Sequence, residues 1–171
     1  GKHVLLGVAS IWSKEKGLED FIQMAHFLNA DEIIVLVGIK EEERKTLPEN
    51  IVGIARTENT HELAELYSLA DAFINPTWQD NYPTVNMEAI ACGTPVVTYR
   101  TGGSMEAVTE ATGFVVERGD YKGLLEAART IRQRGKSYYQ SVCRKYALRH
   151  FNKEERYADY FRLYEDLMMR K

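Results

Sequence analysis

The feature that most constrains this chain is a set of short aliphatic runs that are continuous rather than alternating between apolar and polar residues. Six such runs occupy residues 3–10, 32–39, 51–56, 71–77, 95–100 and 113–118. Continuous runs are typical of strands buried on both faces, the situation in a parallel sheet that helices cover on each side. The runs therefore predict the strands of such a sheet.

Segments with helical spacing separate these runs. The apolar residues of the first segment recur at i, i+3, i+4, i+7 and i+10 and are Leu18, Phe21, Ile22, Ala25 and Leu28. Between them, Glu19, Asp20 and Gln23 are expected to point outward. In a later segment, Asn59 followed by Glu62 predicts a capping box at a helix start. The alternation predicts an α/β fold, a Rossmann-like, doubly wound, mainly parallel sheet with helices on both faces.

After the last strand-like run the chain becomes wholly helical. Its final segment carries a continuous stripe of large apolar residues, Tyr157, Tyr160, Phe161, Tyr164, Leu167 and Met168. We interpret the stripe as core packing in preference to a ligand site. No repeat or linker interrupts the sequence, so residues 1–171 are expected to form one domain.

Composition excludes several classes of protein. The formal net charge of −3 leaves no basic surplus for a phosphate backbone, so nucleic acid is not an expected partner. Cys92 and Cys143 lie outside any spacing typical of zinc or a redox pair, which suggests reduced cysteines and a cytoplasmic protein. No apolar run is long enough for a transmembrane helix, and no secretion signal is recognisable. A strand-like run follows Gly1 almost at once, and from this we expect a missing N-terminal half.

Function is expected beyond the carboxyl ends of the strands, where doubly wound sheets bind ligands. Neither G-x-G-x-x-G nor G-x-x-x-x-G-K-[ST] is present, which argues against a dinucleotide dehydrogenase and a P-loop enzyme. Residues 75–108 instead read as strand, loop, helix, strand, Gly-rich turn and helix. Asp80 lies in the loop, and Glu88 lies in a helix expected to begin near Pro83 or Thr84.

That pattern suits a nucleotide sugar. Backbone N–H groups near Thr84 and Val85, with the helix dipole, are able to hold a diphosphate. Glu88 is placed to accept the ribose hydroxyls through charge-assisted hydrogen bonds, and Asp80 to contact the sugar. The glycines of the turn at residues 101–103 would let backbone approach the ligand closely.

The run D-NYPTVNM-E-AIACGTPVV, followed by TGGSME, resembles the signature of the retaining GT-B glycosyltransferases of family 4. These enzymes carry two acidic residues separated by seven positions, a Cys-Gly-Thr-Pro-Val-Val strand entry and a Gly-Gly turn. The resemblance covers the C-terminal, donor-binding half of such an enzyme. It implies that Asp80 takes the sugar-contacting position and Glu88 the ribose-binding one. Asp at the first position departs from the usual Glu and has a shorter reach.

A second landmark of that family is a Gly-Arg-Leu stretch shortly before Lys-Gly, in which Arg and Lys meet the donor diphosphate. Here the matching run is SIWSKEKG, residues 10–17. Lys16 and Gly17 fit the pattern, whereas Ile11 stands where the Arg is expected. Three explanations stay open: Lys14 compensates, the missing half compensates, or donor binding relies on Lys16 and the helix terminus.

The resemblance implies retaining, metal-independent transfer of a hexose from a UDP- or GDP-sugar to a hydroxyl acceptor, in bacterial polysaccharide, capsule or lipopolysaccharide synthesis. Lys16 and Asp80 are the expected catalytic residues, with Lys16 stabilising the departing diphosphate. No cofactor or metal is expected, and the missing half is expected to bind the acceptor and to make any peripheral contact with the inner face of the membrane. The expected donor-binding residues are Lys16, Arg56, Thr57, Asp80, Asn81, Tyr82, Pro83, Thr84, Val85 and Glu88.

The alternative from another class is a non-catalytic nucleotide-binding or regulatory domain with a flavodoxin-like fold. A receiver module of that kind needs acidic residues at the end of the first strand. The first strand here ends in Ala9, Ser10 and Ile11, which argues against it.

Overall fold

The computed structural model describes residues 1–169, and the six expected strands form a single sheet in it. In chain order the elements are β1 (His3–Val8), α1 (Leu18–Ala25), β2 (Glu32–Val37), α2 (Glu41–Arg44), β3 (Ile51–Ile54), α3 (Thr60–Leu69), β4 (Ala72–Asn75), α4 (Thr84–Ala91), β5 (Val96–Tyr99), β6 (Gly113–Val116), α5 (Tyr121–Arg134), α6 (Lys136–His150) and α7 (Lys153–Met169).

The sheet has the order β3-β2-β1-β4-β5-β6, and every neighbouring pair of strands is parallel. The strand order reverses between β1 and β4, which lie side by side in the middle of the sheet. Loops that leave β1 and β4 at their carboxyl ends diverge there and open a crevice for a ligand. The predicted Rossmann-like, doubly wound sheet is confirmed.

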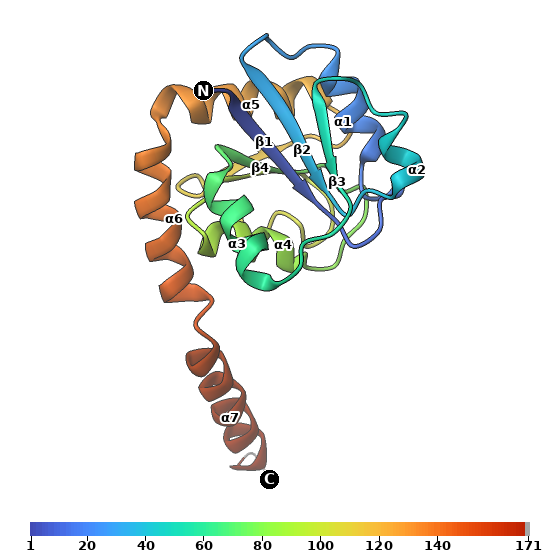
Figure 1. Ribbon diagram of the computed structural model, residues 1–171. Coiled ribbons are helices and arrows are strands. Elements are labelled where there is room, and N and C mark those ends of the chain that lie inside the picture. Colours follow the sequence, from blue (N-terminus) through green and yellow to red (C-terminus); the bar gives the residue numbers. More distant parts are fainter. Residues whose placement is uncertain (170–171) are drawn as a thin grey trace.

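Helices cover both faces of the sheet, as Figure 1 shows. One layer contains α1 and α5, which pack together while α5 also contacts β4, β5 and β6. In the other layer, α3 packs on β1 and α4, and α4 packs on β4, β5 and α6. Half of the predicted capping box of α3 is present, because Asn59 Oδ1 accepts a hydrogen bond from the backbone of Glu62 at 2.9 Å. The Glu62 carboxylate accepts from the backbone N–H of Glu58, not from that of Asn59.

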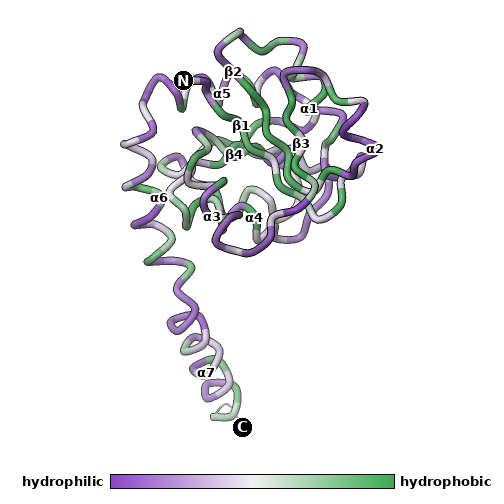
Figure 2. The backbone as a smooth tube through the Cα atoms, in the orientation of Figure 1, coloured by the Kyte–Doolittle hydropathy of each residue, from purple (hydrophilic) through white to green (hydrophobic). Residues whose placement is uncertain are grey.

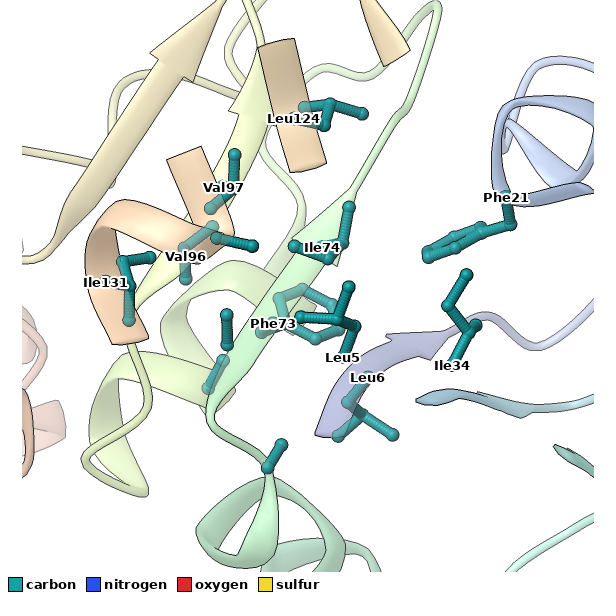
Figure 3. Packing of buried hydrophobic residues seen from close by; sticks show 14 of the residues in the cluster. Leu5, Leu6, Phe21, Ile34, Phe73, Ile74, Val96, Val97, Leu124 and Ile131 are labelled. Atoms are coloured by element: carbon teal, nitrogen blue, oxygen red, sulfur yellow. The ribbon is translucent and has the colours of Figure 1, made fainter. Parts of the chain in front are cut away.

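The core lies between these layers, and its strands are the most hydrophobic stretches of the backbone (Figure 2). Phe73 and Ile74 of β4 occupy its centre, beside Leu5 of β1 and Val97 of β5 (Figure 3). All four side chains are at most 1% exposed. Both faces of the central strands are thus buried, the physical reason for the continuous aliphatic runs.

Two expectations about polar segments are wrong. Asp20, expected to point outward from α1, is only 6% exposed. The helix expected after the Gly-Gly turn is absent, since residues 102–107 form turns instead. In both places, hydrogen bonds with distant residues override the local pattern.

Helix α7 contradicts the expected core packing of the final aromatic stripe. None of its described residues is buried, and Phe161 is 69% exposed. The helix continues beyond the end of α6 and extends away from the α/β body (Figure 1). Helical periodicity shows that one face is apolar, whereas its contacts depend on where the preceding turn directs the helix.

Candidate functional site

Two adjoining hollows lie at the carboxyl ends of the strands, where the strand order reverses. Their volumes are about 480 Å³ and about 400 Å³, and Val8, Ala9, Ser10 and Val85 line both. The first hollow, here the Glu88 hollow, is also lined by Val37, Gly38, Ala55, Arg56, Thr57, Leu63 and Glu88. The second, here the Lys16 hollow, is also lined by Lys16, Asn75, Asp80, Tyr82, Pro83 and Thr84.

Lys16 and Asp80 form an ion pair at the wall of the Lys16 hollow. Lys16 Nζ lies 2.7 Å from Asp80 Oδ2, and the two side chains are 43% and 15% exposed. Lys16 precedes α1, whereas Asp80 follows β4, so two distant loops must meet. Gly17 allows the contact: it has a φ of +75°, and an added Cβ would lie 2.3 Å from the Pro76 carbonyl oxygen.

The amino terminus of α4 points its backbone donors towards the same hollow. The helix begins at Thr84, as predicted, and Pro83 at the N-cap offers no side-chain hydrogen bond. Within residues 1–169, no acceptor bonds to the backbone N–H of Thr84 or Val85. Such exposed N–H groups and the helix dipole favour an anion.

A buried amide network, which the sequence interpretation missed, holds this helix terminus in place. Asn86 is fully buried; it accepts a hydrogen bond from Asn75 at 2.9 Å and donates one to the Ser104 carbonyl at 2.8 Å. It thereby joins α4 to β4 and to the Gly-rich turn. The available signal was an amide in the first turn of a helix whose residues are apolar apart from Thr84 and Glu88, because buried amides need partners.

Glu88 lines the Glu88 hollow together with Arg56 and Thr57. Its Oε2 accepts a hydrogen bond from the Tyr67 hydroxyl at 3.1 Å. Burial, reinforced by the neighbouring Glu88 carboxylate, raises the pKa of Tyr67 well above its ordinary value, so the phenol stays protonated and donates. Within the described residues Oε1 has no hydrogen-bond partner, and it can accept one from a ligand hydroxyl.

The structure brings together nine of the ten residues expected at the donor site, distributed over the two hollows. Asn81 lines neither of them. Lys14, one candidate for compensating the missing arginine, lines a separate hollow with Trp12 and Leu18. Ile11 is 62% exposed and lines neither hollow.

The Gly-rich turn approaches protein rather than open space. An added Cβ on Gly103 would lie 1.6 Å from the Asn81 carbonyl oxygen, and Gly103 N donates to the Asp80 carbonyl at 3.1 Å. An added Cβ on Gly102, which has a φ of +43°, would lie 2.2 Å from the Asp80 carbonyl oxygen. The glycines were expected to make room for a ligand, and they serve to pack the turn against the Asp80 loop.

Positive charge at this site comes from Lys16, Arg56 and the helix terminus. Among residues 1–169, no group of three or more His, Cys, Asp or Glu side chains could hold a metal ion. No helix of this described part of the chain is long and apolar enough to cross a membrane. The arrangement can bind a diphosphate at Lys16 and α4, with a hydroxyl-rich group within reach of Glu88.

Known proteins share this fold. Sucrose-phosphate synthase from Thermosynechococcus elongatus superposes with a TM-score of 0.82 at 22% identity, over 99% of this chain and 46% of that one. The Anabaena protein HepE, solved in complex with UDP-glucose, superposes with a TM-score of 0.72 at 22% identity, over 87% of this chain and 45% of that one.

Sequence comparison identifies the family. The capsular polysaccharide biosynthesis glycosyltransferase CapM of Staphylococcus aureus is 25% identical over 123 residues, which are 66% of this chain and 32% of CapM. The chain thus spans about a third of CapM and under half of the two solved chains. The family model described as "Glycosyl transferases group 1" matches residues 2–134. With the greater part of its length matched, the chain belongs to the glycosyl transferases group 1 family.

Proposed function

We propose that this chain is the donor-binding half of a retaining GT-B glycosyltransferase of family 4, which transfers a hexose from a UDP- or GDP-sugar to a hydroxyl acceptor without a metal ion. The observation that carries the proposal is the pair of adjoining hollows, one lined by Lys16 and the start of α4 and the other by Glu88. A nucleoside diphosphate has the matching chemistry, an anionic diphosphate next to a ribose with two hydroxyls. HepE, which shares the fold, was solved with UDP-glucose, and this supports the same donor class.

Each residue has a distinct role in the proposed reaction. Lys16 Nζ carries three N–H donors, so it can keep its bond to Asp80 and still donate to the diphosphate as negative charge develops on the leaving group. The N–H groups of Thr84 and Val85 add to that stabilisation. Glu88 Oε1 accepts from the ribose, and Asp80, held by Lys16, orients the sugar ring.

We assign the nucleotide base of the donor to the part of the Glu88 hollow nearest Arg56 and Thr57. These residues follow β3, next to the glycine-containing turn after β2, and they leave a space bounded by Gly38, Ala55 and Leu63. CapM is named for capsular polysaccharide synthesis, and this supports a role in building a bacterial surface polysaccharide. We assign acceptor binding, and any peripheral membrane contact, to an N-terminal half that precedes this chain.

Calorimetric titration with UDP, GDP and ADP, with and without magnesium, tests the donor site. We expect saturable binding of one nucleotide that does not depend on magnesium. Glu88→Ala should weaken it at least tenfold, about 1.4 kcal/mol. Glu110→Ala is a matched control, because Glu110 is exposed and lines a different hollow beside β6.

Absence of binding by all three nucleotides at millimolar concentration would contradict the proposal, as would equal weakening by Glu88→Ala and Glu110→Ala. We further expect that this chain alone transfers no sugar to an acceptor, because a GT-B site closes between two halves. Release of UDP or GDP from a nucleotide sugar, with formation of a glycosylated acceptor, would contradict that expectation.

A further inference from the structure

A buried carboxylate that the proposed reaction does not use lies four residues after Lys16 in the sequence. Asp20, in the first turn of α1, is 6% exposed. Its Oδ1 accepts a hydrogen bond from the Tyr99 hydroxyl at 2.6 Å, and its Oδ2 accepts one from Trp78 Nε1 at 2.8 Å. Across residues 1–169, Asp20 has no cationic partner within 4.0 Å. Its charge is therefore satisfied by two neutral donors.

Burying a charge is costly, so this arrangement calls for a reason. Asp20 is 58 residues from Trp78 and 79 residues from Tyr99 in sequence. It therefore links the start of α1 with the loop after β4 and the end of β5. The indole N–H is only a donor, and a carboxylate supplies two acceptor oxygens without a competing donor.

The bond from Trp78 to Asp20 lies beside the ion pair of the proposed site. Asp20 follows Lys16 by four residues, and Trp78 precedes Asp80 by two. The Trp78 backbone N–H donates to the Glu15 carbonyl at 2.8 Å, and the Thr77 hydroxyl lies between the carbonyl oxygens of Glu15 and Gln79, at 3.2 and 3.1 Å. The loop that carries Asp80 is thus attached to the segment that carries Lys16 at several successive points.

The ring of Trp78, a residue that is 37% exposed, makes two further contacts. It packs edge-on against the Tyr99 ring, with centroids 6.2 Å apart, and the Arg118 guanidinium lies over it at 5.6 Å. Tyr99 itself is fully buried in β5. Contacts among Trp78, Asp20 and Tyr99 consequently connect the Asp80 loop to strand β5 of the sheet.

We propose that Asp20 is a positioning residue for the donor site, which through Trp78 and Tyr99 holds the Asp80 loop at the distance where Asp80 meets Lys16. This inference rests on the proposed function for its meaning in catalysis. Asp20 touches no hollow that would hold the donor, and it acts through the placement of Lys16 and Asp80.

The variant Asp20→Leu tests the inference, because it keeps the approximate size of the side chain and removes both acceptors. Titration with UDP and GDP should show at least fivefold weaker binding for this variant. Asp20→Asn should retain most of the affinity, because its amide oxygen accepts from Trp78 and the Tyr99 hydroxyl can rotate to accept from its NH₂ group. The control is Asp71→Leu: Asp71 Oδ2 accepts from the backbone of Val4 at the opposite end of the sheet, and its loss should leave affinity unchanged.

Two further measurements separate positioning from general destabilisation. In an NMR spectrum, Asp20→Leu should shift the Trp78 indole N–H resonance and leave that of Trp12 in place, because Trp12 Nε1 donates to the Val37 carbonyl. In a Lys16→Met background, Asp20→Leu should weaken binding by less than twofold more, because both changes remove the same contact. A purely structural loss would be additive.

The outcomes distinguish the inference from the proposed function. If UDP or GDP binds and Glu88→Ala weakens it, but folded Asp20→Leu binds as well as the wild type, the positioning role is wrong and the donor site stands. An unmoved Trp78 resonance would also overturn the role. If neither nucleotide binds the wild type, the proposed function fails and the role in the donor site fails with it.

Discussion

Aromatic residues are buried in the α/β body and exposed in helix α7. In the body, Phe73 is fully buried and meets Tyr67 edge-on, with ring centroids 5.4 Å apart. In α7, Phe161 is 69% exposed, and the helix buries no described residue. Both segments show an apolar pattern in the sequence. The difference teaches that periodicity predicts an apolar face, whereas the elements that surround it decide whether that face becomes core.

The same substitution in the two regions should give the sharpest contrast, beginning with the largest effect. Phe73→Ala is expected to lower the free energy of unfolding by about 3–5 kcal/mol, because it removes buried surface and leaves a cavity between β4 and its neighbours. Urea unfolding followed by circular dichroism measures this. A loss under about 1 kcal/mol would mean that the body is packed far less tightly than described.

The next effect concerns a glycine of the body at which a side chain would cause backbone strain that repacking of neighbouring side chains cannot relieve. Gly17→Ala should cost about 2 kcal/mol or more, because alanine meets both an unfavourable positive φ and the Pro76 carbonyl oxygen. Gly135→Ala is the control: Gly135 also has a positive φ, and nothing lies within 4 Å of the added Cβ. Equal thermal unfolding midpoints for the two variants would contradict the steric argument.

A buried histidine should make the stability of the body depend on pH. His3 is 5% exposed, and neither ring nitrogen has a hydrogen-bond partner in the described chain. Burial lowers the pKa of His3, and Arg132 adds to this, while Asp71, Glu32 and Asp31 oppose it. The unfolded chain then binds a proton more readily than the folded one, so stability is lost as the pH falls below about 6.5.

Unfolding free energies measured between pH 8 and pH 5.5 test this expectation. His3→Leu should flatten the decrease, because an apolar side chain needs neither a proton nor a partner. His61→Gln is the control, because the His61 side chain is 84% exposed in α3. If the unfolding free energy of both variants falls with decreasing pH as steeply as that of the wild type, protonation of His3 does not limit stability.

The smallest expected effect completes the comparison. Phe161→Ala in α7 should change the free energy of unfolding of this chain by no more than about 0.5 kcal/mol, because an exposed ring loses little when it is removed. Urea unfolding of this variant beside Phe73→Ala measures both under one condition. A loss comparable to that of Phe73→Ala would show that α7 packs against the body in solution.

Several parts of the proposed donor site could be predicted from local sequence. The start of α4 at Thr84 follows from Pro83 and the preceding turn residues, and the loop positions of Lys16 and Asp80 follow from the strand runs before them. The meeting of Lys16 with Asp80 was not derivable from spacing alone, since 64 residues separate them. It depends on β1 and β4 being neighbours in the sheet.

The sequence by itself determined the six strands and the helices between them, except at residues 102–107, because continuous aliphatic runs and capping residues are local properties of the chain. Only the tertiary structure decided that Asp20 is buried, that Gly103 packs against the Asp80 loop and that the face of α7 is left exposed. Each of these depends on contacts between residues far apart in sequence. The free energy of such contacts is set by the partner that the fold supplies, and a local pattern contains no information about that partner.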